Sequence, residues 1–380
     1  MRTILFLVGA VIVGIVVGLL IPESLVNVVL AVRQISGQLI FFLIPLIIIG
    51  FVAPSISAQK GNVSRTLLIA FTLAYCSSVG AAFFSAITAQ YAIPLLNITP
   101  DDSVARALPA QLFTVEIPPI MNVMTALTIA VLLGLGTLWT SSDVFEKALV
   151  QFRSIVLNLV SKILIPILPF YIAANFAVLA YEGTISRLWV FLPVILIVIV
   201  MHYIWLTLLY VGASVYSGKN GWHVVRHYLP AYLTALGTMS SAATLGVALQ
   251  SAHKSDVLKR ETVDFSIPLF ANIHLCGSVL TEVFFVCVVS QLLYGSIPEF
   301  STLALFIILL GIFAVGAPGV PGGTVLASLG IVISVLQFDD AGTAMLIAIF
   351  ALQDSFGTAC NVTGDGALSL IIDKVRSKNE

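Results

Sequence analysis

Charged residues are scarce in this 380-residue sequence: Asp, Glu, Lys and Arg make up only 9% of it, whereas 59% of the residues are hydrophobic. A soluble globular domain has about 25% charged residues, because polar side chains must cover its surface. This composition therefore excludes a water-soluble globule of this size and predicts an all-α polytopic membrane protein. We expect no nucleic-acid partner.

Cysteine is also scarce, and each cysteine lies within an apolar run. The four are Cys76, Cys276, Cys287 and Cys360. In such runs cysteine more often packs as a small hydrophobe than forms a disulfide or binds metal, so these residues do not identify a redox compartment.

Long polar stretches are missing as well, while apolar runs of the length needed to cross a bilayer, about 20 residues, are frequent. We place eight crossings at residues 3–21, 35–57, 66–95, 119–140, 150–180, 187–216, 265–294 and 341–372. The first run is long enough to span and lacks a small-x-small cleavage site, which favours a transmembrane helix over a signal peptide. The longest polar segment, Asn97–Pro119, is predicted to be an external loop.

Basic residues indicate the orientation of these crossings, since cytoplasmic segments carry an excess of Lys and Arg. With a cytoplasmic amino terminus, the cytoplasmic segments hold Arg2, Lys60, Arg65, Lys147, Arg153, Lys219, Arg226, Lys254, Lys259, Arg260, Lys374, Arg376 and Lys378. The opposite side holds Arg33, Arg106 and Arg187. We therefore expect a multi-pass protein of the plasma (inner) membrane with both termini in the cytoplasm.

Two regions do not have the sequence pattern of a simple transmembrane crossing. Residues 233–250 have short apolar limbs around a hydroxyl-rich centre, and residues 302–337 are broken by "VGAPGVPGG". Gly and Pro at that density cannot continue a helix, and an interrupted backbone inside a membrane must line protein or a watery cavity. We predict two re-entrant helical hairpins and a binding site of the inverted-repeat transporter type, while two kinked helices in a packed bundle remain the alternative.

Polar residues in the last crossing share one helical face. Asp354, Asn361 and Asp365 are spaced i, i+7 and i+11, which brings them within about 20° of one another on a helix. An aspartate inside a membrane usually faces a cavity, a partner or an ion. Because Lys162 is the only basic candidate besides histidines, we expect an external cation to pair with at least one of the two carboxylates.

The preceding crossing carries His274, Ser278 and Glu282, four residues apart and thus expected on one face. A glutamate in an apolar helix is a candidate proton carrier, although hydrogen bonding within the bundle is equally consistent. His274 can bind a ligand, carry a proton or simply form hydrogen bonds in the core.

Four segments in a fixed order resemble the dicarboxylate/amino acid:cation symporters, which have the glutamate transporter fold. They are the serine-rich "GTMSSAATLG", the helix after it with its "GS", the break "GAPGVPGG" and the final "NVTGDG". The resemblance is strongest over 233–373 and rests on topology over 1–217. It implies eight transmembrane helices, two re-entrant hairpins and inverted repeats. It also implies a homotrimer whose protomers combine a scaffold with an elevator-type transport domain. Residues 1–217 would form mostly the scaffold, with helices 3 and 6 moving, and residues 218–380 the core of the transport domain.

The resemblance also implies the roles of individual residues. Asp354 would hold a substrate amino group and Asn361 its carboxylate, with Met239, Ser241, Ser278, Val320, Thr324, Gly357 and Thr358 beside the substrate. Asp365 and Asn361 would bind sodium, and backbone carbonyls near Ala314, Val315 and Ala317 would form a second sodium site.

Two departures from the family pattern refine this prediction. Members that take acidic substrates have an arginine where Gly357 stands, and some have one where Met239 stands. A neutral amino acid is therefore the expected substrate, with Gly357 leaving room for its side chain. The family's "NMDGT" reads "HLCGS" here, so its asparagine becomes His274 and its aspartate becomes Cys276, and the loss of that aspartate should abolish one of the sodium sites. Glu282 falls where proton-coupled members have their glutamate, so we expect fewer coupled sodium ions, with Glu282 or His274 as the proton carrier.

The sequence thus predicts a secondary active transporter that couples a neutral amino acid to sodium, protons or both by an elevator mechanism, with no organic cofactor. A carrier of acidic amino acids or dicarboxylates with an altered site, or a proton-coupled carrier of another small organic solute, remains open. An intramembrane aspartyl protease is excluded, because Asp354 and Asp365 lie about 16 Å apart on one helix. The protein is not expected to be an enzyme.

Overall fold

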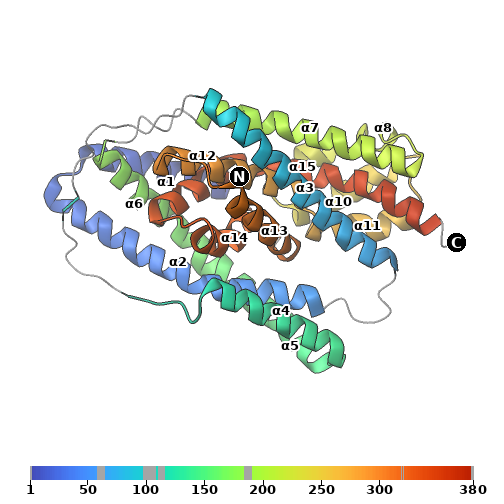
Figure 1. The fold of residues 1–380 in the computed structure, drawn as a ribbon, viewed down its shortest axis with the longest axis horizontal. Coiled ribbons are helices and arrows are strands. Elements are labelled where there is room, and N and C mark those ends of the chain that lie inside the picture. The colour runs from blue at the N-terminus through green and yellow to red at the C-terminus, as the bar shows by residue number, and fades with distance from the viewer. Residues whose placement is uncertain are drawn as a thin grey trace.

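The computed structural model describes residues 2–57, 65–96, 108–109, 116–183, 191–317, 319 and 321–377, and these contain helices and no strand (Figure 1). The first half comprises α1 (Arg2–Leu20), α2 (Glu23–Ser57), α3 (Arg65–Leu95), α4 (Val123–Thr140), α5 (Asp143–Leu159), η1 (Val160–Leu164), α6 (Ile165–Tyr181) and α7 (Phe191–Ser217). The second half comprises α8 (Trp222–Val225), α9 (Leu229–Thr238), α10 (Ser241–His253), α11 (Arg260–Ile273), α12 (Cys276–Tyr294), α13 (Phe300–Gly316), α14 (Gly323–Ser334) and α15 (Asp340–Ser377). The prediction of an all-α protein is confirmed.

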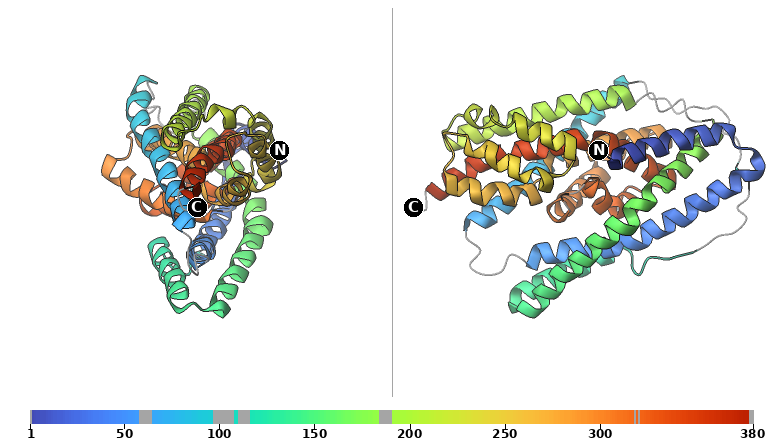
Figure 2. Two further views of the ribbon diagram at one scale, coloured as in Figure 1. Left: turned by 90° about the vertical axis from the view of Figure 1, so that its right-hand side faces the viewer. Right: turned by 180° about the vertical axis from the view of Figure 1, so that it is seen from behind.

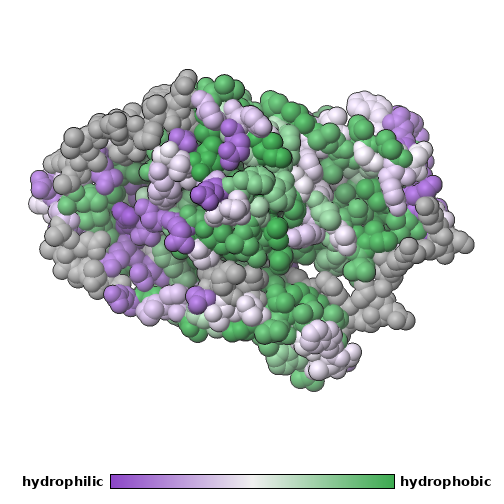
Figure 3. Space-filling view, in the orientation of Figure 1, coloured by the Kyte–Doolittle hydropathy of each residue, from purple (hydrophilic) through white to green (hydrophobic). Residues whose placement is uncertain are grey.

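Six helical segments of the described chain are long and apolar enough to cross a membrane. They are Glu23–Pro54, Thr66–Leu95, Asp143–Tyr181, Phe191–Ser217, Arg260–Tyr294 and Asp340–Ser377. The two other predicted crossings correspond to α1 and α4, helices of 19 and 18 residues. Hydrophobic residues gather over the middle of the surface seen in Figure 3, and α7 exposes leucines and valines along its length. These features are those of a multi-pass membrane protein.

Two local features depart from the expected crossings. The segment that continues from α5 into α6 passes through η1, a π-helical turn directly before Pro166. Proline has no N–H to donate to the preceding turn, which accounts for the wider winding there. The crossing predicted at 265–294 is interrupted: His274 and Leu275 have non-helical backbone between α11 and α12. The expectation that His274 shares a helical face with Ser278 is therefore wrong.

Both irregular regions form a pair of helices that contact each other. In the first pair, α9 and α10 meet at Met239, which has a left-handed backbone (φ 52°), and at Ser240, which caps α10 by accepting from Ala243 N (3.2 Å). In the second, α13 and α14 meet around Gly322 (φ 72°). At 1.5 Å per residue, α9 and α14 are only about 15 and 18 Å long, short of the roughly 30 Å of a bilayer core.

The helix α15 lies at the centre of the molecule (Figures 1 and 2). It contacts α3, α6, α7, α9, α10, α11, α12 and α14. The helices α2, α4, α5 and α6 form a second group, of which α4 and α5 project away from the centre in Figure 2. Residues from both irregular pairs and from the α11–α12 interruption therefore converge on α15.

Candidate functional site

Asp354 lies on α15 beneath the second helix pair and is 5% exposed. Its Oδ2 accepts a hydrogen bond from the backbone N–H of Gly322 at 2.7 Å. A small cavity of about 30 Å³ adjoins this contact. Met239, Pro321, Gly322, Phe350 and Asp354 line it, together with aliphatic side chains of α6, α14 and α15. The structure thus brings the predicted residues Met239 and Asp354 to one cavity between the two pairs.

The tips of the two helix pairs are joined directly. Ser240 Oγ donates a hydrogen bond to the Gly319 carbonyl at 2.6 Å. Sequence reasoning selected the neighbouring Ser241, which is 3% exposed, and missed Ser240. The signal was present, because a serine directly before a helical stretch is a typical N-cap. With the tips joined and Asp354 bonded to Gly322, this conformation is closed over the cavity.

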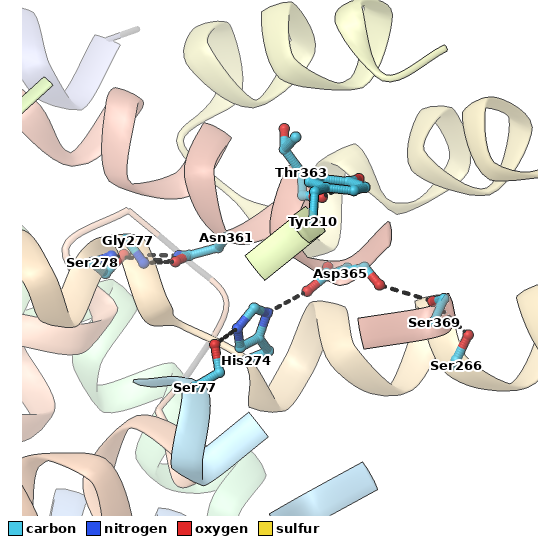
Figure 4. Close-up of polar contacts among 10 residues, drawn as sticks. All are labelled: Ser77, Tyr210, Ser266, His274, Gly277, Ser278, Asn361, Thr363, Asp365 and Ser369. Atoms are coloured by element: carbon cyan, nitrogen blue, oxygen red, sulfur yellow. Dashed lines mark hydrogen bonds and ion pairs between the residues drawn. The ribbon is translucent and has the colours of Figure 1, made fainter. Parts of the chain in front are cut away.

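Both the oxygen and the nitrogen of the Asn361 amide bond to the start of α12. Its Oδ1 accepts from Gly277 N (2.7 Å) and Ser278 N (3.2 Å), and its Nδ2 donates to Ser278 Oγ (2.9 Å) (Figure 4). The first N–H groups of a helix have no partner within the helix, so the Asn361 amide acts as the cap of α12. Asn361 and Ser278, both predicted to bind substrate, therefore bind each other in this conformation.

Gly357 does not face an open space. A Cβ added at Gly357 would lie 3.3 Å from Ser278 Cα and N, and one added at Gly277 would lie 2.5 Å from the Gly357 carbonyl oxygen. These glycines allow α12 and α15 to pack backbone against backbone. In this conformation α12 occupies the space in which the side chain of a substrate was expected.

Asp365 is paired with a protein side chain. His274 Nδ1 lies 2.9 Å from Asp365 Oδ1, and His274 Nε2 lies 2.9 Å from Ser77 Oγ on α3 (Figure 4). His274 is 0% and Asp365 1% exposed. Lys162, by contrast, lies on the surface of η1. Asp365 therefore has a protein partner, His274, which sequence reasoning did not assign to it; the external cation was expected for at least one of Asp354 and Asp365.

Glu282 is completely buried on α12 and accepts a hydrogen bond from Ser328 Oγ on α14. Its other oxygen, Oε2, has no partner among the described residues. Another buried histidine, His202 on α7, contacts the Gly277 carbonyl (3.1 Å) and Thr281 Oγ1 (2.9 Å). Sequence reasoning gave neither Ser328 nor His202 a role, because both contacts join segments distant in the chain.

Of the remaining predicted residues, Thr358 lies within α15, Thr324 lies at the start of α14, and Ala314, Val315 and Ala317 lie at the end of α13. Thr324 and Thr358 are buried, 5% and 4% exposed. At the end of α13, Ala317 donates its N–H to the Ala314 carbonyl at 3.3 Å, and Val315 is partly buried. The last carbonyls of a helix lack intrahelical partners and carry partial negative charge, so they can serve as ligands for a cation. Val320 lies outside the described residues.

Comparisons with known proteins agree with this arrangement. The chain is 26% identical over 392 aligned residues to the serine/threonine transporter SstT of Streptococcus thermophilus (strain CNRZ 1066), covering 97% of this chain and 94% of that protein. Residues 4–375 match the family model described as "Sodium:dicarboxylate symporter family". Nearly the whole chain is covered, so the chain belongs to the sodium:dicarboxylate symporter family, which consists of cation-coupled transporters and not of enzymes.

Proposed function

We propose that this protein is a secondary active transporter that couples the uptake of a neutral amino acid to a cation gradient. The observation that carries the proposal is the cavity at Asp354: one carboxylate stands among apolar side chains, and no lysine or arginine of the described chain lines it. A lone buried carboxylate suits an ammonium group, whereas a second carboxylate on the substrate would be buried without a cationic partner. A relative that is a serine/threonine transporter supports the same substrate class.

The substrate carboxylate requires hydrogen-bond donors, and two helix ends supply them. The N-termini of α10 and α14 lie at the two tips, where backbone N–H groups and the helix dipole favour an anion. Asn361 Nδ2 becomes available if it leaves Ser278 Oγ. Met239, Ser241, Val320, Thr324 and Thr358 complete the proposed substrate site.

Substrate entry requires the closed tips to separate. A cavity of about 30 Å³ is too small for an amino acid. Opening breaks the Gly322–Asp354 and Ser240–Gly319 hydrogen bonds, and a substrate ammonium then replaces Gly322 N at Asp354. The α13–α14 pair thus acts as the gate.

The cation coupling involves two further groups. Sodium would bind at the carbonyl end of α13, near Ala314, Val315 and Ala317. A proton would be carried by Glu282, whose Oε1 accepts from Ser328 on α14 and whose Oε2 has no partner in the described chain. Uptake is then expected to respond to an inward proton gradient and to lose that response in Glu282→Gln.

The proposed architecture follows the family. It has eight crossings with two re-entrant hairpins, α9–α10 and α13–α14, and both termini in the cytoplasm of a plasma-membrane homotrimer. Residues 1–217 are mostly scaffold, and residues 218–380 form the core of a transport domain that moves like an elevator. Crosslinking of single-cysteine variants in the membrane would test these assignments.

Uptake into liposomes tests the substrate class. The purified protein should accumulate labelled serine, threonine or alanine at least about tenfold faster than aspartate, glutamate or succinate under a sodium gradient. Asp354→Asn should lower affinity by roughly 100-fold, about 3 kcal/mol, because it leaves the ammonium without its charged partner. Asp256→Asn, which alters an exposed carboxylate outside the helices, is the matched control. Faster uptake of aspartate than of any neutral amino acid would refute the proposal.

A further inference from the structure

The Asp365 carboxylate on α15 is buried, 1% exposed, and faces the imidazole of His274. Only one of its oxygens, Oδ1, has a donor in the described chain, and that donor is His274 Nδ1. If Nδ1 carries the hydrogen, Nε2 of the neutral imidazole accepts the Ser77 hydroxyl, so the ring satisfies both contacts without a net charge. The imidazole therefore occupies the position from which a ligand would approach Oδ1.

The surrounding backbone is shaped to hold this imidazole. His274 is the residue at which α11 ends, and its N–H donates to the Phe270 carbonyl at 2.9 Å. A Cβ added at Gly364 would lie 2.9 Å from His274 Cε1, so a glycine is required where the ring crosses α15. The ring is thus fixed by Ser77 on α3, by Asp365 and by the glycine next to it.

The residues present do not fit a sodium ion at this place. A sodium site requires several oxygen atoms directed at one point, and Asp365 Oδ2 is the only side-chain oxygen of Asp365 and Asn361 without a donor in the described chain. Asp365 Oδ1 faces His274 Nδ1, and Asn361 Oδ1 faces two backbone N–H groups at 2.7 and 3.2 Å. A donor N–H directed at each of these oxygens presents its positive end where the ion would bind.

We infer that His274 takes the place of a coupling cation at Asp365, so that the side chain closes one cation site of the family in this protein. It follows that His274 sets how many sodium ions the protein binds, and that replacing it by a smaller residue opens a sodium site at Asp365. For transport, this inference rests on the proposed cation coupling. For ion binding, the inference does not depend on the proposed function and can be tested without any substrate.

Thermal unfolding of the full-length protein in detergent tests the inference. The midpoint is compared in NaCl and in choline chloride at equal ionic strength for the wild type, Asp365→Asn, His274→Asn and the double variant. Because a bound ion stabilises the folded state, His274→Asn should gain a sodium-dependent increase of a few degrees, and the double variant should lose it. In the wild-type background, Asp365→Asn should leave the sodium response unchanged, since an amide oxygen can still accept from His274.

His202→Asn is the matched control, because His202 is buried in the same core but does not contact Asp365. It should change stability without adding a sodium response. The inference is overturned if Asp365→Asn abolishes a sodium response of the wild type, or if His274→Asn responds to sodium no more than the wild type does. If His274→Asn fails to fold, the Asp365→Asn comparison alone still decides. A protein that passes this test yet transports no amino acid would refute only the proposed function.

Discussion

Removing the Ser240 hydroxyl is predicted to open the substrate cavity more often. Ser240→Ala deletes the hydrogen bond to the Gly319 carbonyl (2.6 Å), which exists only while the tips are joined. A hydrogen bond of this kind contributes about 1 kcal/mol net, within a range of about 0.5 to 1.5. The open population should therefore rise about fivefold, within limits of roughly two- and twelvefold. The loss of the α10 cap, also about 1 kcal/mol, lowers overall stability in both conformations.

A cysteine at the second tip reports this opening. Gly319→Cys is a suitable reporter, because an added Cβ meets Ala242 only at ordinary distances of 3.5 and 3.6 Å. Cys76, the one exposed native cysteine, is replaced by serine in all variants, while the other three are buried. The rate of maleimide labelling at position 319 should rise about fivefold when Ser240→Ala is added.

Ser241→Ala provides the matched control for this experiment. It removes a hydroxyl one residue further along, on the first residue of α10, without touching the bond between the tips. Its labelling rate should stay close to that of the parent. An increase equal to that of Ser240→Ala, or no increase in Ser240→Ala itself, would refute the view that this hydrogen bond holds the tips together.

Two further predictions concern packing and charge. Gly277→Ala should destabilise the protein by about 1–3 kcal/mol, because its Cβ would lie 2.5 Å from atoms of α15. Its control is Gly237→Ala, whose Cβ would meet nothing within 4 Å and which should be neutral or slightly stabilising. Thermal unfolding compares the two variants. Lys219→Met should destabilise the protein by roughly 2 kcal/mol, since Asp373 is fully buried and loses its charged partner. The loss is not larger because the Lys219 side chain is 32% exposed, so that water screens the ion pair. Lys254→Met, on an exposed lysine, is its control, and equal unfolding midpoints for the two variants would contradict the assignment.

The shared face of the polar residues on the last helix was predictable, because helical periodicity is a local property. Asp354, Asn361 and Asp365 all lie buried on α15 as their spacing requires. The two breaks that lie around Met239 and Gly322 were also predictable, since small, hydroxyl-bearing and proline residues interrupt helices through their own chemistry.

The interruption at His274 was not predictable in this way. The stretch "FANIHLCGS" contains no proline, and its one glycine lies past the break. What stabilises the break is Asn361, which lies 84 and 83 residues further along the chain from the N–H groups that it caps. The partner of Asp365 was missed for the same reason, because His274 reaches the carboxylate only when the chain leaves the helix.

The α11–α12 interruption gives a physical link between the proposed substrate site and the His274–Asp365 pair. Two residues of α15, one turn apart, hold its two sides: Asn361 caps the start of α12, and Asp365 holds His274 at the end of α11. A substrate carboxylate bound by Asn361, as proposed, competes with Ser278 for Nδ2 and so loosens one side of this interruption. Because a ligand shifts an equilibrium only through its different affinity for the two states, the change at Asn361 must then alter the strength of the His274–Asp365 contact, and the reverse. The proposed substrate site and the contact that closes the cation site at Asp365 can therefore be coupled through the same backbone break without sharing a single ligand atom.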